Sequence, residues 1–265
     1  MTLDLLNPQY TSPEAIKQLT ADFQNGFPYK HIVLDNFLKT EIAADLYENF
    51  PAVEKLHKHY DGLNEKKSEG SNFEDFSPVF SQVRNFVMGE DFAKWMAVVT
   101  GIEGVFVTDD KLGTGLHQGG NGSFLDIHVD FSIHHVKNVH RRLNMLIYLN
   151  KNWQESYGGG MEMWNADMTK LEKKVLPLLN RCLIFETNQI SYHGYSTITI
   201  PENETRKSFY TYFYTPITEE IKVKYHDTIF KPKPEDSTVK KITTNLKETA
   251  KNTIKGMMKD LGILK

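Results

Sequence analysis

The residues whose types most directly suggest chemistry are two histidines, an aspartate and an arginine. His128 and Asp130 are separated by one residue, His193 lies further along the chain, and Arg206 follows it. Two imidazoles and one carboxylate can occupy one face of an octahedral iron and leave three positions for a chelating cosubstrate and oxygen. The guanidinium of Arg206 is a fixed cation that could hold the far carboxylate of that cosubstrate. Together these residues suggest an iron-dependent oxygenase.

The spacing of His128 and Asp130 suits a β-strand. Side chains at positions i and i+2 of a strand point the same way, about 7 Å apart along the backbone. Residues 123–131 alternate between polar and apolar types, with Phe124 as the exception. By this alternation Asp126 shares the inward face with His128 and Asp130. We therefore expect Asp126 to contact a cationic or hydrogen-bond-donating group of the substrate, with a position at the rim of the site as the alternative.

A His-x-Asp tripeptide alone is a weak signal, because it also arises by chance. A second copy, His59-Tyr60-Asp61, follows His57 within the polar segment 55–69. That segment lacks apolar alternation and is predicted to be a loop or a solvated helix. Metal sites need rigid, partly buried ligands, so this cluster is expected to lie at the surface without a metal. Three further histidines are expected in a polar lid or loop: His134, His135 and His140.

Composition narrows the class of protein. The chain has 265 residues, of which 40% are hydrophobic and 12% aromatic, enough for one large, well-packed domain. The net charge of −3 gives no basic footprint, so no nucleic-acid partner is expected. We expect no membrane span, since no apolar run reaches about 18 residues. The start of the chain lacks a basic region followed by an apolar stretch, so we expect no secretory signal and a cytoplasmic location. The single Cys182 excludes an internal disulfide and is expected to be a small buried hydrophobe.

The first part of the chain, residues 1–103, is predicted to be a helical and mixed segment that packs on the core. Residues 52–82 within it are polar and weakly patterned. The predicted elements are helices at 13–24 (capped by Ser12), 41–50 (capped by Thr40) and 92–99 (ended by Gly101), and a short strand at 31–34.

Residues 104–232 are predicted to form the catalytic core. Many short strands separated by glycine-rich turns favour a sandwich or a barrel, so the fold class is mainly β with flanking helices. The β-rich runs lie at 104–108, 123–130, 143–149, 160–164, 182–186 and 207–215.

Residues 233–265 are predicted to form a helical tail that is rich in lysine. We expect this helix to dock on its own domain; the alternative is a basic amphipathic helix for an acidic partner or a membrane surface. Its apolar residues fall roughly at helical spacing: Ile242, Leu246, Ile254, Met257, Met258 and Leu261.

Two predicted strands carry further candidate site residues. By parity Asn144, Leu146 and Tyr148 share one face, where the Tyr148 hydroxyl could donate to a carboxylate in the cavity. Asn144 is a candidate substrate contact on this face. Arg206 and Ser208 likewise share a face of the last long strand. The alternatives are a plain core aromatic for Tyr148 and a surface ion pair for Arg206.

The order of these motifs resembles the Fe(II)/2-oxoglutarate-dependent dioxygenases, specifically the prolyl 4-hydroxylase-like branch. The resemblance spans about residues 104–216: H-x-D, a strand ending in Tyr-Leu-Asn before Trp153, a glycine turn with an alternating strand, the distal His193 and an R-x-S motif. Residues 31–38 also resemble the opening segment of family members. The resemblance implies a double-stranded β-helix core of the jelly-roll or cupin type.

The resemblance also implies the roles of the site residues and the reaction. His128, Asp130 and His193 would be the catalytic residues that bind Fe(II), and Arg206, Tyr148 and Ser208 would bind 2-oxoglutarate. The family uses O₂ and converts 2-oxoglutarate to succinate and CO₂ while it oxidises a substrate C–H bond. Because related halogenases usually have a small residue in place of this aspartate, a carboxylate there favours hydroxylation.

The substrate is left open by these motifs. An unactivated C–H bond of a peptidyl proline, an amino acid or another small metabolite would fit, since function depends on the site rather than the scaffold. Two other classes also stay open: a non-oxidative metal-binding β-barrel protein, and an inactive scaffold that acts through its basic tail.

Overall fold

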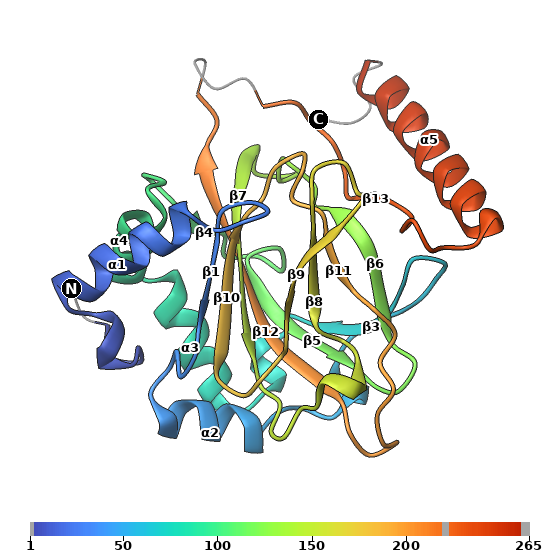
Figure 1. The fold of residues 1–265 in the computed structure, drawn as a ribbon. Helices are drawn as coiled ribbons and strands as arrows, with labels where there is room; N and C mark the ends of the chain where they lie inside the picture. The colour runs from blue at the N-terminus through green and yellow to red at the C-terminus, as the bar shows by residue number, and fades with distance from the viewer. Residues whose placement is uncertain (1–2, 219–222, 261–265) are drawn as a thin grey trace.

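The strands form one antiparallel sheet that folds back on itself in the computed structural model, which describes residues 3–218 and 223–260 (Figure 1). The strand order is β1-β10-β7-β12-β5-β3-β6-β11-β8-β9, while β2 pairs with β3, β4 with β12, and β13 with β6. The strands are β1 His31–Leu34, β2 Lys58–Asp61, β3 Glu65–Gly70, β4 Phe106–Val107, β5 Thr114–Gly119, β6 Phe124–Val129, β7 Val139–Tyr148, β8 Met161–Trp164, β9 Leu171–Val175, β10 Arg181–Glu186, β11 His193–Tyr195, β12 Arg206–Pro216 and β13 Ile229–Phe230. The predicted mainly β fold with flanking helices is confirmed.

Two layers of strands enclose the interior of the fold. Strands β1, β10, β7, β12 and β5 form one layer, and β6, β11, β8 and β9 form the other. Strand β3 joins the layers, because residues 68–70 pair with β5 and residues 65–66 pair with β6. The two layers together form the double-stranded jelly-roll core that was predicted.

Alternation along β7 separates two apolar regions. Met145 and Ile147 pack in the core between the sheet and the N-terminal helices, whereas Leu146 and Tyr148 belong to a second cluster inside the fold. Figure 1 shows the N-terminal helices on the β1 and β10 side of the sheet. These helices are α1 Pro13–Gln24, α2 Thr40–Glu48, α3 Pro78–Met88 and α4 Glu90–Thr100. The inward face of β7 is therefore available to the site, as parity predicted.

Two of the helix ends match the predicted caps, and one does not. Ser12 caps α1 by accepting a hydrogen bond from the Ala15 backbone N–H, and Gly101 ends α4 in the left-handed conformation. The predicted cap of α2 is wrong: Thr40 is its first residue, and Lys39 occupies the cap position without a side-chain hydrogen bond. Buried Cys182 is confirmed as a small core residue.

The prediction of a loop or a solvated helix for residues 55–69 is wrong, because this segment contains two strands. Residues 58–70 form the hairpin β2–β3, and α3 begins at Pro78. The sheet also crosses the predicted boundary after residue 103, since β1 and β3 lie on its N-terminal side. The N-terminal part therefore contributes strands to the core sheet as well as helices that cover it.

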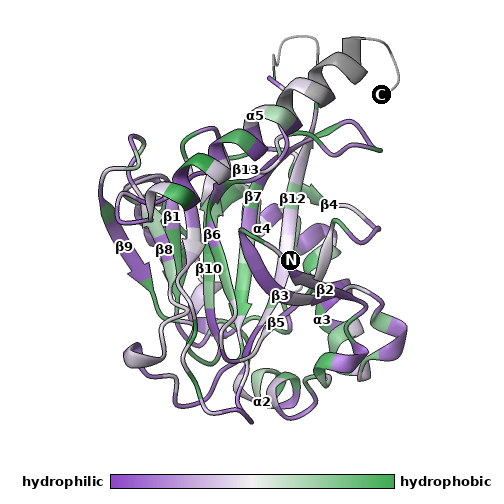
Figure 2. Cartoon of the chain, turned by 90° about the vertical axis from the view of Figure 1, so that its right-hand side faces the viewer, coloured by the Kyte–Doolittle hydropathy of each residue, from purple (hydrophilic) through white to green (hydrophobic). Residues whose placement is uncertain are grey.

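The C-terminal helix α5, Thr238–Asp260, docks through polar residues. Thr244 and Glu248 are buried, and Lys240 forms an ion pair with Asp126 of β6. The predicted apolar residues Ile242 and Leu246 are exposed instead, and Figure 2 shows hydrophobic bands along this helix. Ile254, Met257, Met258 and Leu261, also in that prediction, lie outside the side chains that the structure describes. Within the described ranges no helix has the length and apolar character needed to cross a membrane.

Candidate functional site

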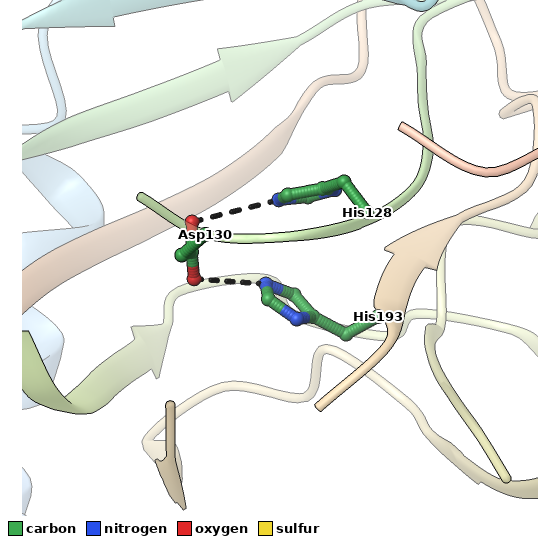
Figure 3. Close-up of side chains that lie close together, drawn as sticks. All are labelled: His128, Asp130 and His193. Atoms are coloured by element: carbon green, nitrogen blue, oxygen red, sulfur yellow. Dashed lines mark ion pairs between the residues drawn. The ribbon is translucent and has the colours of Figure 1, made fainter. Parts of the chain in front are cut away.

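Strands β6 and β11 bring the three predicted ligands together. His128 and His193 are directly opposite each other in the antiparallel pair, and Asp130 follows the last residue of β6. His128 Nε2 is 3.6 Å from Asp130 Oδ1, and His193 Nε2 is 3.3 Å from Asp130 Oδ2 (Figure 3). One ligand atom from each residue lies within 4.8 Å of the others, and all three residues are buried. Sequence spacing thus predicted a cluster that the fold assembles.

The backbone orients both imidazoles toward the centre of this cluster. His128 Nδ1 is 2.9 Å from the Asp126 carbonyl oxygen, and His193 Nδ1 is 2.8 Å from the Ser191 carbonyl oxygen. A carbonyl oxygen can only accept, so each Nδ1 carries the proton and each Nε2 presents a lone pair. Burial and the nearby His193 lower the pKa of His128, which favours its neutral form. Two lone pairs and a carboxylate at this distance fit a bound divalent cation.

A β-bulge in β6 shifts the predicted alternation. His193 pairs with His128 but Tyr195 pairs with Leu125, so β6 has one extra residue between the two pairs. Gly194 lies opposite the bulge, where a Cβ atom would be 2.5 Å from the Leu125 carbonyl oxygen. Only glycine permits this close approach of the backbones. The bulge places Leu125, rather than Asp126, beside His128 in the cavity wall.

Asp126 is therefore not on the inward face, and its predicted contact with substrate has no support in the geometry. Its Oδ1 is 2.8 Å from Lys240 Nζ on α5, and the residue does not line the cavity at the ligands. Burial raises the pKa of Asp126 against the opposing effect of Lys240.

Replacing Asp126 by asparagine should loosen α5 without changing the metal site. We expect faster proteolysis within residues 238–260 and a loss of unfolding free energy of about 1 kcal/mol or less, because the pair is partly exposed. Lys247→Ala, at an exposed position of the same helix, is the matched control. Reduced Fe(II) binding with unchanged proteolysis would contradict this account.

Asp130 is held by two residues of β7. Asn144 Nδ2 donates to Asp130 Oδ2 at 2.7 Å, and Arg141 Nη2 lies 3.2 Å from the same oxygen. Arg141 also donates to Asn144 Oδ1 from Nε and Nη2, at 3.0 and 2.7 Å. Burial raises the pKa of Asp130, but Arg141 and His193 outweigh it and hold the pKa well below its ordinary value. Asn144, predicted to contact substrate, lines the cavity and orients the carboxylate of Asp130.

Arg141 is a site residue that the sequence analysis missed. Its guanidinium lies 3.6 Å from the ring centre of Tyr212 and 4.6 Å from that of Phe131, and the residue is 2% exposed. A charged side chain at the start of a long apolar strand was the available signal, but only the fold shows that it reaches Asp130.

Two strands, β7 and β12, supply the polar residues predicted to hold the cosubstrate. Ser208 of β12 is directly opposite Tyr148 of β7, and Arg206 lies two residues away on the same strand. All three are buried, and Arg206 Nη2, Tyr148 Oη and Ser208 Oγ have no hydrogen-bond partner among the described residues. Arg206 is held in place by donating from Nε to the Gly159 carbonyl oxygen at 2.7 Å and by lying over the Tyr195 ring. Burial raises the pKa of Tyr148 to about 12, so its hydroxyl remains a donor.

Unpartnered buried donors are costly, and a bound carboxylate would satisfy them. Arg206 and Ser208 line the same cavity of about 70 Å³ as the three candidate metal ligands. A larger cavity of about 240 Å³ adjoins it and shares Asp130 and Arg141 as wall residues. The arrangement fits a chelating keto acid whose far end lies at Arg206, with open space on the other side of Asp130.

Other histidine clusters do not form metal sites in the ranges 3–218 and 223–260, where one suitable group is found, at His128, Asp130 and His193. The second tripeptide, His59-Tyr60-Asp61, lies in the β2–β3 hairpin, where His59 Nδ1 contacts Ser68 Oγ. His134 is buried against Asp110, with 3.0 Å between Nε2 and Oδ2.

Comparison with known proteins agrees with this geometry. Residues 114–214 match the model of the 2OG-Fe(II) oxygenase superfamily. The predicted resemblance to the Fe(II)/2-oxoglutarate-dependent dioxygenases is confirmed. The matched segment begins at β5 and ends within β12, so it contains all three candidate ligands together with Tyr148, Arg206 and Ser208. Fe(II) and 2-oxoglutarate, the predicted cofactors, are those for which this oxygenase family is named.

Relatives by sequence and by structure include prolyl hydroxylases. The chain is 24% identical over 203 residues to prolyl 3-hydroxylase OGFOD1 of Mus musculus, which covers 71% of this chain and 33% of that protein. It thus spans about a third of the length of the curated relatives it matches. A Trichoplax adhaerens prolyl hydroxylase, solved with a peptide fragment of hypoxia inducible factor, has a TM-score of 0.53 at 15% identity, over 78% of this chain and 95% of that one.

A further structural neighbour is named an epimerase rather than a hydroxylase. The α-ketoglutarate-dependent epimerase SnoN from nogalamycin biosynthesis has a TM-score of 0.54 at 11% identity, covering 77% of this chain and 84% of that chain. At these identities the likeness to solved structures shows a shared fold, and it confirms the jelly-roll core.

Proposed function

We propose that the protein is an Fe(II)- and 2-oxoglutarate-dependent dioxygenase that hydroxylates a prolyl residue of a peptide. The reaction would combine the substrate C–H bond, O₂ and 2-oxoglutarate to give C–OH, succinate and CO₂. The observation that carries the proposal is one cavity with a metal-ligand cluster at one side and unpartnered donors at the other.

His128, Asp130 and His193 would hold the iron, which when bound supplies the redox chemistry of oxygen activation and C–H oxidation. The protein residues do the positioning. Asn144 and Arg141 fix the Asp130 carboxylate through Oδ2, which would keep it oriented as a ligand for the metal. Because Asp130 occupies a ligand position, hydroxylation is favoured over halogenation.

Arg206, Tyr148 and Ser208 would orient 2-oxoglutarate through its far carboxylate. A buried guanidinium and a protonated phenol are strong donors to a carboxylate in a site that excludes water. This anchor would fix the chelating end of the keto acid at the metal side of the cavity.

The larger cavity beside Asp130 is the proposed place for the substrate. Its wall includes Thr187, Asn188 and Gln189, whose side chains can hydrogen-bond to peptide amide groups. Arg142 and Glu186 also line this cavity, with 3.8 Å between Arg142 Nη2 and Glu186 Oε1. The curated relatives named prolyl 3-hydroxylases support a prolyl substrate, and an amino acid or other small metabolite is the second candidate.

Two measurements test this function. Anaerobic addition of 2-oxoglutarate to the Fe(II)-loaded protein should produce a weak visible charge-transfer band, which a non-oxidative metal site would not show. Under air, proline-containing peptides should stimulate succinate formation and gain one oxygen atom by mass, while free proline should not. Absence of the band would refute the cofactor assignment; stimulation by free amino acids alone would refute the peptidyl substrate.

The two other classes are less consistent with the site. A simple metal-binding protein has no need for the buried donors of Arg206, Tyr148 and Ser208. An inactive scaffold would bind its partner through the tail without metal, and removal of the residues after Pro234 would abolish that binding.

Arg206→Gln should weaken 2-oxoglutarate binding by about 10- to 100-fold, because a charge-assisted hydrogen bond contributes about 1.5–3 kcal/mol. Fe(II) binding should be unchanged, since Arg206 does not contact the ligand cluster. Titration of 2-oxoglutarate against the metal-loaded variant would measure this effect. Equal affinity in the variant and the wild type would contradict the assigned anchor.

A further inference from the structure

Strand β3 and its neighbour β5 bring two residues to the cosubstrate side of the cavity that no sequence motif indicated. Lys67 of β3 and His117 of β5 line the same cavity as Arg206 and Ser208. Lys67 is 12% exposed in its side chain. Since β3 joins the two layers, it closes the interior at this end and places a second cation inside it.

The strand register places His117 beside the predicted anchor. Ser208 is opposite Tyr148 on one side and opposite His117 on the other, so the three side chains form a row across β7, β12 and β5. His117 stacks on Tyr210, with ring centres 4.3 Å apart. Its Nε2 has no hydrogen-bond partner in the described part of the chain, and the nearest carboxylate, Glu69 Oε2, is 3.7 Å away.

Lys67 and Arg206 line the same cavity as His117, and their charges affect its pKa. Burial, followed by Lys67 and with a smaller effect of Arg206, lowers the pKa of His117 to about 4, against the opposing effect of Glu69. The imidazole is therefore neutral near pH 7 and can donate one hydrogen bond. On β5 the residue opposite Arg206 is Gly119, which places no side chain between β12 and β3.

A carboxylate offers about four lone-pair positions for hydrogen bonds. The buried atoms without partners among residues 3–218 and 223–260 include one from each of four neighbouring residues: Arg206 Nη2, Tyr148 Oη, Ser208 Oγ and His117 Nε2. We propose that His117 and Lys67 belong to the cosubstrate pocket, His117 as a neutral donor to the distal carboxylate and Lys67 as the second cation facing it. This inference rests on the proposed function, because it assumes that 2-oxoglutarate is the ligand.

Lys67 also has a carboxylate close to it, that of Glu65, which affects how a Lys67 variant is interpreted. Lys67 Nζ lies 3.5 Å from Glu65 Oε2 on the same strand, and 5.5 Å from the Tyr60 ring centre. Removal of Lys67 alone would also leave Glu65 uncompensated. The double variant Glu65→Gln/Lys67→Ala therefore distinguishes a direct role of Lys67 from a role in neutralising Glu65.

The test compares 2-oxoglutarate with pyruvate, which keeps the chelating keto acid but lacks the distal carboxylate. Calorimetric titration of the Mn(II)-loaded protein should give a Kd for 2-oxoglutarate about tenfold or more higher in Lys67→Ala, with the Kd for pyruvate unchanged. His117→Phe keeps the ring stacked on Tyr210 and should raise the Kd for 2-oxoglutarate about two- to tenfold. Lys66→Ala is the matched control, since Lys66 is exposed on the same strand and should have no effect.

Each result decides between the possibilities. Wild-type affinity in both Lys67→Ala and His117→Phe, or equal weakening for pyruvate and 2-oxoglutarate, would overturn the inference alone. Recovery of affinity in Glu65→Gln/Lys67→Ala would show that Lys67 only neutralises Glu65, which also overturns its direct role. A wild-type protein that binds pyruvate but not 2-oxoglutarate, or neither, would refute the proposed function together with this inference.

Discussion

His193→Ala is expected to abolish Fe(II) binding and hydroxylation. The variant keeps His128 and Asp130 but loses the Nε2 lone pair that lies 3.3 Å from Asp130 Oδ2. Loss of a residue that merely orients a ligand costs about 10- to 100-fold in metal affinity, so loss of a ligand should cost more than about 100-fold. Equilibrium dialysis with Fe(II) under argon, followed by succinate release under air, measures both effects.

The chain provides a matched control for this substitution in its second His-x-Asp tripeptide. His59→Ala also removes one imidazole, at the position that corresponds to His128 in the first tripeptide, but His59 contacts Ser68 on the hairpin and has no role in the ligand cluster. Its Fe(II) affinity should equal that of the wild type. If His193→Ala bound Fe(II) normally while His59→Ala did not, the metal centre would have been assigned to the wrong tripeptide.

The contrast between these two tripeptides shows what the sequence could predict. His128 and Asp130 lie in or directly after an alternating strand that is followed, in order, by the other motifs. This order was enough to predict the residues that the fold brings together around one cavity, Arg206 included. Asp126 was misplaced because alternation assumes a regular strand. The bulge opposite Gly194 depends on the pairing of β6 with β11, which is not encoded within residues 123–131.

The hairpin at 58–70 was missed for a related reason. Strand prediction relies on an apolar face, but β3 presents Glu65, Lys67 and Glu69 on one side and Lys66 and Ser68 on the other. Its order comes from pairing with β5 and β6, which are distant in the sequence. Polar strands that line a site therefore look like loops until their partners are known.

α5 illustrates the opposite error in reasoning from a pattern. The helical spacing of Ile242 and Leu246 predicted the helix correctly, but these residues are exposed and the helix docks through Thr244, Glu248 and Lys240. Periodicity indicates that a helix forms, whereas the contact face depends on complementary groups such as Asp126.

Arg141→Leu is expected to lower the free energy of unfolding of the metal-free protein by about 3–5 kcal/mol. Breaking a buried pair costs this much because it leaves an uncompensated charge, here the carboxylate of Asp130. Asn144 Oδ1 would also lose the two hydrogen bonds that it accepts from Arg141. Urea unfolding, monitored by tryptophan fluorescence, measures the change.

Bound metal should reduce this loss, because a divalent ion also compensates the charge of Asp130. Unfolding in saturating Mn(II) should therefore show a smaller difference between Arg141→Leu and the wild type than unfolding in a chelator. Arg142→Leu is the matched control: its partner Glu186 is 3.8 Å away and both side chains are partly exposed, so the expected cost is about 1 kcal/mol or less with or without metal. An equal loss for Arg141→Leu in both conditions would mean that Arg141 stabilises the packing around Tyr212 and Phe131 rather than the charge of the metal-binding carboxylate.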